Sequence, residues 1–294
     1  MPPRQQLAEF LRARRRRLKP EDVGLPVGDR RRVPGLRREE VAALAGLSAD
    51  YYVRLEQGRD HRPSDQVLES LATALRLDAD ATGHLFALAR PGPQVVRAFA
   101  SIEERVDSTL QELLDGWAMT PTLVHGRRLD VLASNALALA LSPLSEPGRN
   151  MLRAVFLESD VRAGYEDLDK VLETTVAYFR ASAGSDLGDP WFASLVAEVS
   201  SESAEFRRLW AQHDVRAALD GQIGYRHPIV GSMSLRYQTA AVGTSGQTLF
   251  MVHADPGTPD AESLALLARL ADGTEPTQAW PGADPTMPRM AADR

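Results

Sequence analysis

LRREEVAALAGLSADYYVRLEQG, residues Leu36 to Gly58, indicates the fold of the first third of this chain. Its apolar residues repeat at helical spacing on both sides of Gly46, which predicts two short helices joined by a tight turn. Gly46 tolerates the positive φ of a helix end, and Ser48 is a suitable N-cap. We expect helices over Arg38–Ala45 and Ala49–Gln57. An ordinary helical hairpin is the alternative at this point.

The second of these helices has distinct inner and outer faces. Ala42 and Ala45 are small where the two helices cross, and Leu47, Tyr52 and Leu55 point inward. The inward residues hold the second helix at a fixed angle, as in a helix-turn-helix whose second helix lies in the major groove of DNA. Five residues remain on its outer face: Ala49, Asp50, Tyr51, Arg54 and Gln57.

Short helical patterns flank this motif and predict an all-α, five-helix domain over residues 1–90. One helix precedes the motif, with Leu7 and Phe10 on its apolar face, and two follow it at about Ser64–Leu77 and Ala79–Ala89. Residues 19–36 form a loop punctuated by Pro and Gly, and Pro91-Gly92-Pro93 marks the end of the domain.

The string REEVAALAGLS…YYVRLEQGR resembles the helix-turn-helix of the XRE family, and the resemblance extends over residues 7–89. It implies that Ala49, Asp50 and Arg54 reach base edges. Arg54 would then favour guanine, and Asp50 could accept from a cytosine amino group. Other predicted DNA-binding residues contact phosphates and so set the register of the protein on the duplex, or lie at the start of the recognition helix. They are Arg38, Ser48, Tyr51, Arg59, His61 and Arg62.

Two further expectations concern arginines outside the motif. The resemblance implies that Arg15 on the first helix pairs with Glu56, so that removing one partner would leave a charge uncompensated. The insertion 19–36 contains Arg30, Arg31 and Arg32, for which we hypothesise an arm that follows the DNA backbone or enters a minor groove. A solvated basic loop is the alternative.

The second half of the chain reads as an α+β domain over residues 94–272. Strand-like runs at Thr122–His125 and Leu129–Ala133 surround a hairpin turn, and helical patterns fill roughly 134–219. Strand-like runs then return at Gly224–His227, Ser232–Ala241 and Thr248–Ala254, before a helix at Asp260–Ala271. This order predicts helices around an antiparallel sheet. Residues 273–294 read as a disordered tail.

Four strings of this half resemble the ligand-binding domain of MmyB-like transcription regulators: residues 120–141, FRRLWAQHDV (206–215), YRHPIVG (225–231) and SLRY (234–237). The insertion with RRVPGLRREE is itself typical of this group. The resemblance implies a PAS-like domain with helical insertions that binds small apolar molecules, including fatty acids. Leu129 stands where relatives usually carry Trp, which would reshape the pocket.

Polar and aromatic residues within these motifs are the candidate ligand contacts, because an Arg or His beside an apolar cavity can hold a carboxylate. They are Asn135, Tyr178, Trp210, His213, Arg226, His227 and Arg236. A structural interpretation competes with this one, in which Trp210 and His213-Asp214 only fasten the helical block to the sheet.

The charge of the chain is unevenly distributed. Residues 1–90 hold 17 basic and 13 acidic side chains, whereas residues 91–294 hold 17 basic and 27 acidic ones. Such asymmetry indicates a nucleic-acid-facing or membrane-facing segment joined to a separate acidic domain. There is no cysteine, no signal peptide and no apolar run long enough to span a membrane, so we expect a cytoplasmic protein that is nucleoid-associated when bound to DNA.

No catalytic, cofactor or metal-ligand motif is present, so no catalytic residue, cofactor or metal is expected.

The sequence predicts a bacterial transcription regulator that binds a palindromic double-stranded DNA operator as a homodimer and responds to a small apolar or fatty-acid-like ligand. Repression relieved by ligand is the commoner arrangement. The alternatives are a constitutive dimeric repressor with a purely structural C-terminal domain and an enzyme fused to a helix-turn-helix.

Overall fold

A computed structural model describes residues 3–26, 33, 35–59, 63–90, 104–184, 190–243 and 246–272. The chain divides into two compact units, the first comprising Met1–Glu103 with Leu172–Leu219 and the second comprising Glu104–Val171 with Asp220–Arg294. Residues 172–219 therefore group with the N-terminal helices, so these units differ from the predicted domains 1–90 and 94–272. The predicted tail at 273–294 lies outside the described residues. No described helix is long and apolar enough to cross a membrane.

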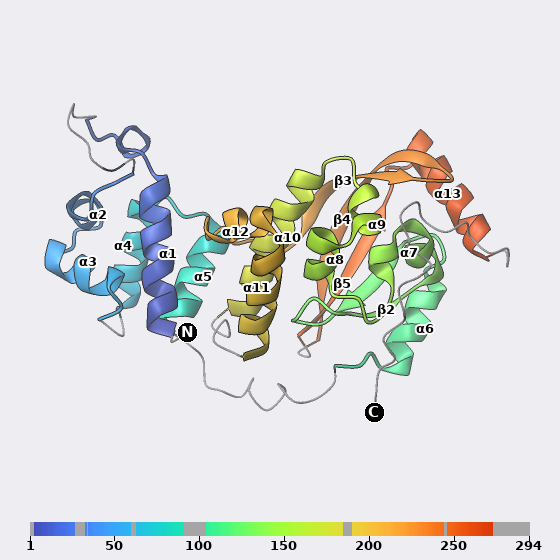
Figure 1. Cartoon of the computed structure of the whole chain (residues 1–294), viewed down its shortest axis with the longest axis horizontal. Helices are drawn as coiled ribbons and strands as arrows, with labels where there is room; N and C mark the ends of the chain where they lie inside the picture. The colour runs from blue at the N-terminus through green and yellow to red at the C-terminus, as the bar shows by residue number, and fades with distance from the viewer. Residues whose placement is uncertain are drawn as a thin grey trace. The chain divides into compact units, whose positions relative to one another are not determined.

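The first unit contains the five expected helices (Figure 1). They are α1 (Pro3–Arg17), α2 (Arg38–Leu44), α3 (Ala49–Glu56), α4 (Asp65–Ala74) and α5 (Ala79–Ala89). Ser48, Ser64 and Asp78 cap α3, α4 and α5 by accepting from backbone N–H groups, as the sequence pattern requires. The helical expectation for this region is confirmed, with bounds that agree within about three residues.

The insertion between α1 and α2 is held against α1 at its end. It contains a short 3₁₀ helix, η1 (Pro20–Val23), where the sequence predicted only loop. The Leu36 N–H donates to the Arg15 carbonyl. A Cβ on Gly35 would lie 2.4 Å from the Arg16 carbonyl oxygen, so only glycine allows this close approach.

Three helices from later in the chain complete the first unit: most of α10 (Leu168–Ala183), α11 (Pro190–Glu202) and α12 (Ala204–Trp210). Val215, just beyond α12, belongs to the same hydrophobic core as Phe10, Tyr52 and Leu85 of the five N-terminal helices, and Ala181 of α10 packs against that core. The N-terminal helices and this later segment thus share one core.

The second unit is built on a five-stranded antiparallel sheet with the order β2-β1-β5-β4-β3 (Figure 1). Its strands are β1 (Thr122–His125), β2 (Val131–Ser134), β3 (Asp220–His227), β4 (Gly231–Val242) and β5 (Gln247–His253). The α+β expectation is confirmed. β2 begins at Val131 rather than at the predicted Leu129, because Leu129 adopts φ +63° and closes the preceding turn.

The two faces of the sheet differ. Tyr225, Met233 and Tyr237 lie on one face of β3 and β4 and are buried, whereas the alternate residues of these strands are mostly exposed. The Tyr165 ring lies 5.6 Å from the Tyr225 ring, and His227 contacts the Ala140 carbonyl. These contacts place α7 (Ala136–Leu141) and the segment after α9 (Ser159–Ala163) on the buried face.

The remaining elements of the second unit are α6 (Ser108–Gly116), η3 (Pro143–Ser145), α8 (Met151–Leu157) and α13 (Pro259–Asp272). Leu114 of α6 packs with Val124 and Ala133 in a small core against β1 and β2. The sequence analysis did not predict α6. The helix at α13 is confirmed.

Candidate nucleic-acid interface and ligand-binding residues

The turn between α2 and α3 has the expected local chemistry. Gly46 adopts φ +66°, and the Leu47 N–H donates to the Ala42 carbonyl at 2.8 Å. The Ser48 hydroxyl accepts from the Tyr51 N–H at 3.2 Å and caps α3. A left-handed residue followed by an N-cap reverses the chain abruptly, so the start of α3 is fixed relative to α2.

The inner and outer faces of α3 differ in exposure to solvent. Tyr52 and Leu55 are 0% and 1% exposed and anchor the helix in the core. Ala49, Asp50 and Arg54 lie on the exposed side. The Arg54 guanidinium lies over the Tyr51 ring at 5.7 Å from its centroid. Contact with an aromatic ring restricts the orientation of such a side chain.

A fully buried carboxylate, Glu56, fixes the other end of α3. Its two oxygens accept from the Arg15 guanidinium at 2.9 and 2.6 Å, a bidentate ion pair. The Arg38 Nε lies 3.4 Å from the same carboxylate. Burial alone would raise the pKa of Glu56, but hydrogen bonds and charges from Arg15 and Arg38 outweigh burial and hold that pKa below its usual value. The pair that the resemblance implied is therefore present.

The Glu56 cluster joins three parts of the first unit. The Arg15 guanidinium also donates to the Leu36 carbonyl at 2.8 Å, which secures the end of the insertion. Arg12 donates to the Glu56 carbonyl at 3.3 Å. Because α1, the insertion and α3 meet at one buried carboxylate, the recognition helix is held in place by charge-assisted bonds as well as by apolar packing.

The remaining predicted DNA-binding residues have different surroundings. The Arg38 guanidinium pairs with the Glu56 carboxylate, and the residue is partly exposed. Arg59, which follows α3, is exposed. Arg30, Arg31, Arg32, His61 and Arg62 lie outside the described residues, so their predicted roles have no structural counterpart here.

Two of the predicted ligand residues are already fully bonded within the second unit. The Asn135 side chain accepts from the Thr122 and Ala138 N–H groups and donates to three backbone carbonyls, with its shortest contact at 2.8 Å. The two ring nitrogens of His227 contact the Ala140 carbonyl and the N–H groups of residues 229 and 230. If His227 is neutral and carries its proton on Nε2, then Nε2–H donates to the Ala140 carbonyl and Nδ1 accepts from the two N–H groups. The polar side-chain atoms of Asn135 and His227 are thus already engaged within the protein.

Arg226 and Arg236 lie on the exposed face of the sheet, opposite the buried Tyr225 and Tyr237. Arg226 donates to the Glu166 carbonyl at 3.2 Å, and Arg236 pairs with Asp255 at 2.8 Å. The structure does not bring these two residues together with Asn135 and His227 around one cavity.

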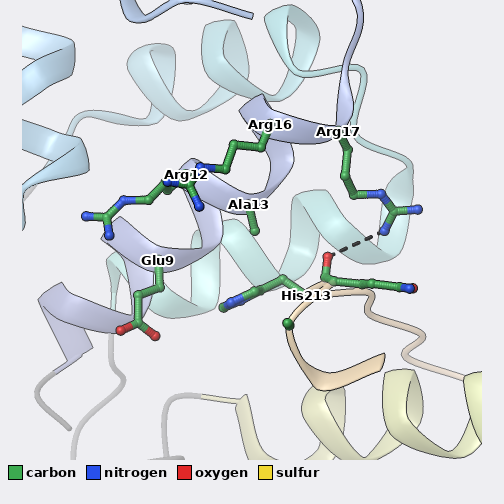
Figure 2. A pocket seen from close by; sticks show the side chains of 8 residues that line it. Glu9, Arg12, Ala13, Arg16, Arg17 and His213 are labelled. Atoms are coloured by element: carbon green, nitrogen blue, oxygen red, sulfur yellow. Dashed lines mark hydrogen bonds between the residues drawn. The ribbon is translucent and has the colours of Figure 1, made fainter. Parts of the chain in front are cut away.

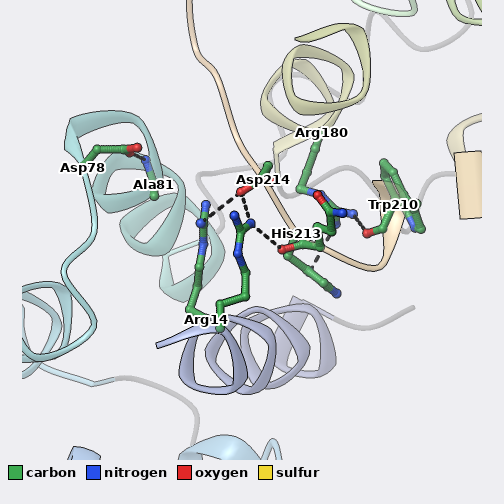
Figure 3. Close-up of polar contacts among 9 residues, drawn as sticks. Arg14, Asp78, Ala81, Arg180, Trp210, His213 and Asp214 are labelled. Atoms are coloured by element: carbon green, nitrogen blue, oxygen red, sulfur yellow. Dashed lines mark hydrogen bonds and ion pairs between the residues drawn. The ribbon is translucent and has the colours of Figure 1, made fainter. Parts of the chain in front are cut away.

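The other three predicted ligand residues, Tyr178, Trp210 and His213, belong to the first unit. There Trp210 and His213 contact Arg180, a residue that is 2% exposed and that sequence reasoning missed. Its guanidinium stacks on the Trp210 ring at 3.7 Å, donates to the Trp210 carbonyl and contacts the His213 Nδ1 at 3.3 Å (Figure 3). Arg180 has no carboxylate partner in the described part of the chain.

Asp214 fastens this segment to α1. Its carboxylate pairs with Arg14 at 3.2 Å and with Arg17 (Figure 3). One proposed structural role for His213-Asp214 was to bind the helical block to the sheet, and the observed partner of Asp214 is α1 instead. Asp214 lies 200 positions from Arg14 and 197 from Arg17, so only the motif FRRLWAQHDV indicated a special role for this segment.

Burial sets the charge states of this cluster. Burial, assisted by Arg14, lowers the pKa of Arg180 to about 9. Burial and the nearby Arg180 lower the pKa of His84 to about 4 and of His213 to about 3. The two histidines are therefore neutral at pH 7, while the arginines stay charged. No three His, Cys, Asp or Glu side chains of the described residues converge to hold a metal ion.

Two family models match the chain. The MmyB-like transcription regulator ligand binding domain matches residues 106–267, and a helix-turn-helix domain matches residues 6–85. No curated protein matches significantly. The matches support an MmyB-like regulator with a helix-turn-helix domain, and the match to the ligand binding domain includes residues 172–219, which pack with the N-terminal helices.

Proposed function

Because the chain belongs to the MmyB-like transcription regulators, we propose that it binds a palindromic operator as a homodimer through α3 and responds to a small apolar, fatty-acid-like ligand. The helix-turn-helix and the ligand-binding domain make it a DNA-binding transcription regulator rather than an enzyme. The observation that carries the proposal is the exposed face of α3, held in place by the buried Arg15–Glu56 pair.

In this proposal, Ala49, Asp50 and Arg54 read base edges in the major groove. Arg54 donates its fork to guanine O6 and N7, and Asp50 accepts from a cytosine amino group. Ser48, Tyr51, Arg38 and Arg59 contact phosphates and set the register. The predicted arm of Arg30, Arg31 and Arg32, with His61 and Arg62, would add backbone contacts and steepen the salt dependence of binding.

Selection from random duplex DNA by the full chain tests this reading. We expect the selected sequences to converge on an inverted repeat with one strongly preferred G·C pair in each half-site. Arg54→Ala should lose the preference at that pair, whereas Arg269→Ala, an exposed arginine of α13, should select the wild-type operator. A wild-type operator selected by Arg54→Ala would refute the placement of α3.

The homodimer follows from the size of the recognition element. One helix-turn-helix reads too few base pairs to select a genomic site, and a twofold dimer on an inverted repeat solves this problem. We propose that the dimer forms through the C-terminal domain. Sedimentation of the free chain, and of its complex with one operator duplex, should give two chains per duplex. One chain on a complete operator would contradict the proposal.

The proposed ligand lies in the ligand-binding domain, with its apolar part against the buried face of the sheet near Tyr225 and Tyr237. Asn135 and His227 are structural in this arrangement because their polar atoms are already bonded. Arg226 and Arg236 lie on the opposite face of the sheet, and Tyr178, Trp210 and His213 belong to the first unit, so these five stay predicted ligand contacts without a place beside Tyr225 and Tyr237. The ligand shifts operator affinity only by binding one dimer geometry better than another.

Mass spectrometry of an organic extract of the denatured protein tests the sensing role. We expect a fatty acid to be released, and the same fatty acid to change operator affinity when it is added back. No released lipid, together with operator affinity unchanged by added fatty acids, would favour a constitutive repressor whose C-terminal domain is purely structural.

A further inference from the structure

We propose that a pocket between α1 and the turn after α12 binds a small organic anion that carries carboxylate or phosphate groups. The pocket lies wholly within the first unit, and the inference is independent of the fatty-acid-like ligand proposed above.

The pocket has the size of a small-molecule site. Its volume is about 540 Å³, within the range of roughly 300–1,000 Å³ that such sites occupy. Arg12, Arg16 and Arg17 line it from one face of α1, with Glu9 and Ala13, and His213 closes it from the opposite side (Figure 2). His213 adopts φ +56°, and its Nδ1 contacts the buried Arg180, so this wall is fixed.

Positive charge around the pocket exceeds negative charge. Arg12 shares the carboxylate of Glu56, and Arg17 pairs with Asp214. Arg16 is exposed and has no carboxylate partner among the described residues. Glu9 is the one carboxylate that lines the pocket. An anion with one or two charges would therefore complete the local charge balance.

Buried cations behind the pocket increase this attraction. Arg180 is 2% exposed, its Nε has no hydrogen-bond partner in the described residues, and Asp214 is already shared by two other arginines. Burial also lowers the pKa of Arg14, despite its pairing with Asp214. His84 and His213 are neutral at pH 7, so the arginines supply the positive charge of this region. A charge in this weakly solvated region acts over a longer range than it would in water.

A free anion fits this site better than the phosphates of a DNA duplex do. Duplex DNA brings about one negative charge per 1.7 Å of its axis, and several of these charges would face Glu9 and Asp214 as well as the arginines. A single small anion can instead contact Arg16, which has no carboxylate partner among the described residues, and need not face several carboxylates at once. Several charge-assisted hydrogen bonds from guanidinium groups would hold it.

Calorimetric titration of the full chain with sodium citrate, and separately with inorganic phosphate, tests the site at constant ionic strength set with sodium chloride. We expect saturable binding of at least one probe with one site per chain. Arg16→Ala should weaken it about tenfold, the effect of one lost charge-assisted bond. Ala13→Glu, which puts a carboxylate into the pocket, should abolish it. Arg269→Ala is the matched control and should bind as the wild type does.

Circular dichroism and melting curves establish that each variant is folded. If Ala13→Glu does not fold, Arg16→Ala still tests the site, because Arg16 is exposed and its replacement should not disturb the fold. Binding of neither probe would overturn the inference, as would an undiminished response in Arg16→Ala. So would a lower salt slope of operator binding in Arg16→Ala without any citrate or phosphate binding, because Arg16 would then serve the DNA.

Discussion

Two arginine clusters of the first unit have opposite charge balances. At Glu56, three arginines surround one carboxylate that is 0% exposed, and the buried Arg15 is paired by two short hydrogen bonds. At Arg180, a buried guanidinium has an aromatic ring, a carbonyl and a neutral His as neighbours but no carboxylate in the described residues. The first cluster is closed and positions α3. The second retains positive charge next to a pocket.

Replacing either Arg15 or Arg180 with methionine distinguishes the two clusters, and the larger effect is expected at Arg15. Arg15→Met should lower the free energy of unfolding by about 3 kcal/mol, because it leaves the buried Glu56 with weaker partners. Chemical denaturation at pH 7 measures this. Asp255→Asn, which breaks an exposed pair with Arg236, is the control and should cost under about 1 kcal/mol. A loss at Arg15 no larger than the control's would mean that the pair does not fix α3.

Acidification should reveal His84, a buried neutral histidine whose pKa the nearby Arg180 helps to lower. The pKa of His84 is lowered from 6.5 to about 4, so the unfolded state binds a proton at a higher pH than the folded state does. Stability is therefore complete above pH 6.5 and falls as the pH drops toward 4, by about 2 kcal/mol between pH 7 and pH 5. His84→Phe should remove this part of the slope in denaturation curves. An unchanged slope would show that His84 is not buried as a neutral ring.

The Asp214 link should contribute less, because its carboxylate is 37% exposed. We expect Asp214→Asn to lower the free energy of unfolding by about 1 kcal/mol or less at low salt, and by a smaller amount at high salt. Hydrogen exchange should also rise at the C-terminal end of α1 and around residue 214. Exchange that is unaltered in α1 would mean that the link does not hold this helix.

Arg180→Met should have the smallest effect of the series. Methionine keeps much of the apolar stem and removes a buried charge whose pKa burial has lowered to about 9. Stability should change by less than about 1 kcal/mol or increase, since buried charges replaced by apolar groups are often neutral or stabilising changes. A loss as large as that of Arg15→Met would erase the distinction between the two clusters.

Local chemistry explains what the sequence could predict. The caps Ser48, Ser64 and Asp78 and the left-handed Gly46 set the helix bounds of the first unit, because these signals act within one turn of the chain. The alternation of buried residues located β4 for the same reason. The Arg15–Glu56 pair was found through family resemblance, which supplies a contact between residues 41 positions apart.

Longer-range features had no such signal. Arg14 and Asp214 are 200 positions apart, and nothing in either local pattern marks them as partners. Asn135 and His227 looked like ligand residues because they are polar residues within motifs, but their bonds to backbone groups fix the structure. The grouping of residues 172–219 with the N-terminal helices depends on the shared core at Val215, which periodicity does not reveal.

We propose that α3, held by the Glu56 cluster, reads DNA through Arg54. The most direct test is the ratio of operator to non-specific DNA affinity, measured at one salt concentration for the wild type and Arg54→Ala. We predict a loss of about 1–3 kcal/mol of discrimination per half-site, hence about 2–6 kcal/mol for the dimer, with non-specific affinity nearly unchanged. Equal loss of affinity for both kinds of DNA, or no loss at all, would contradict the account.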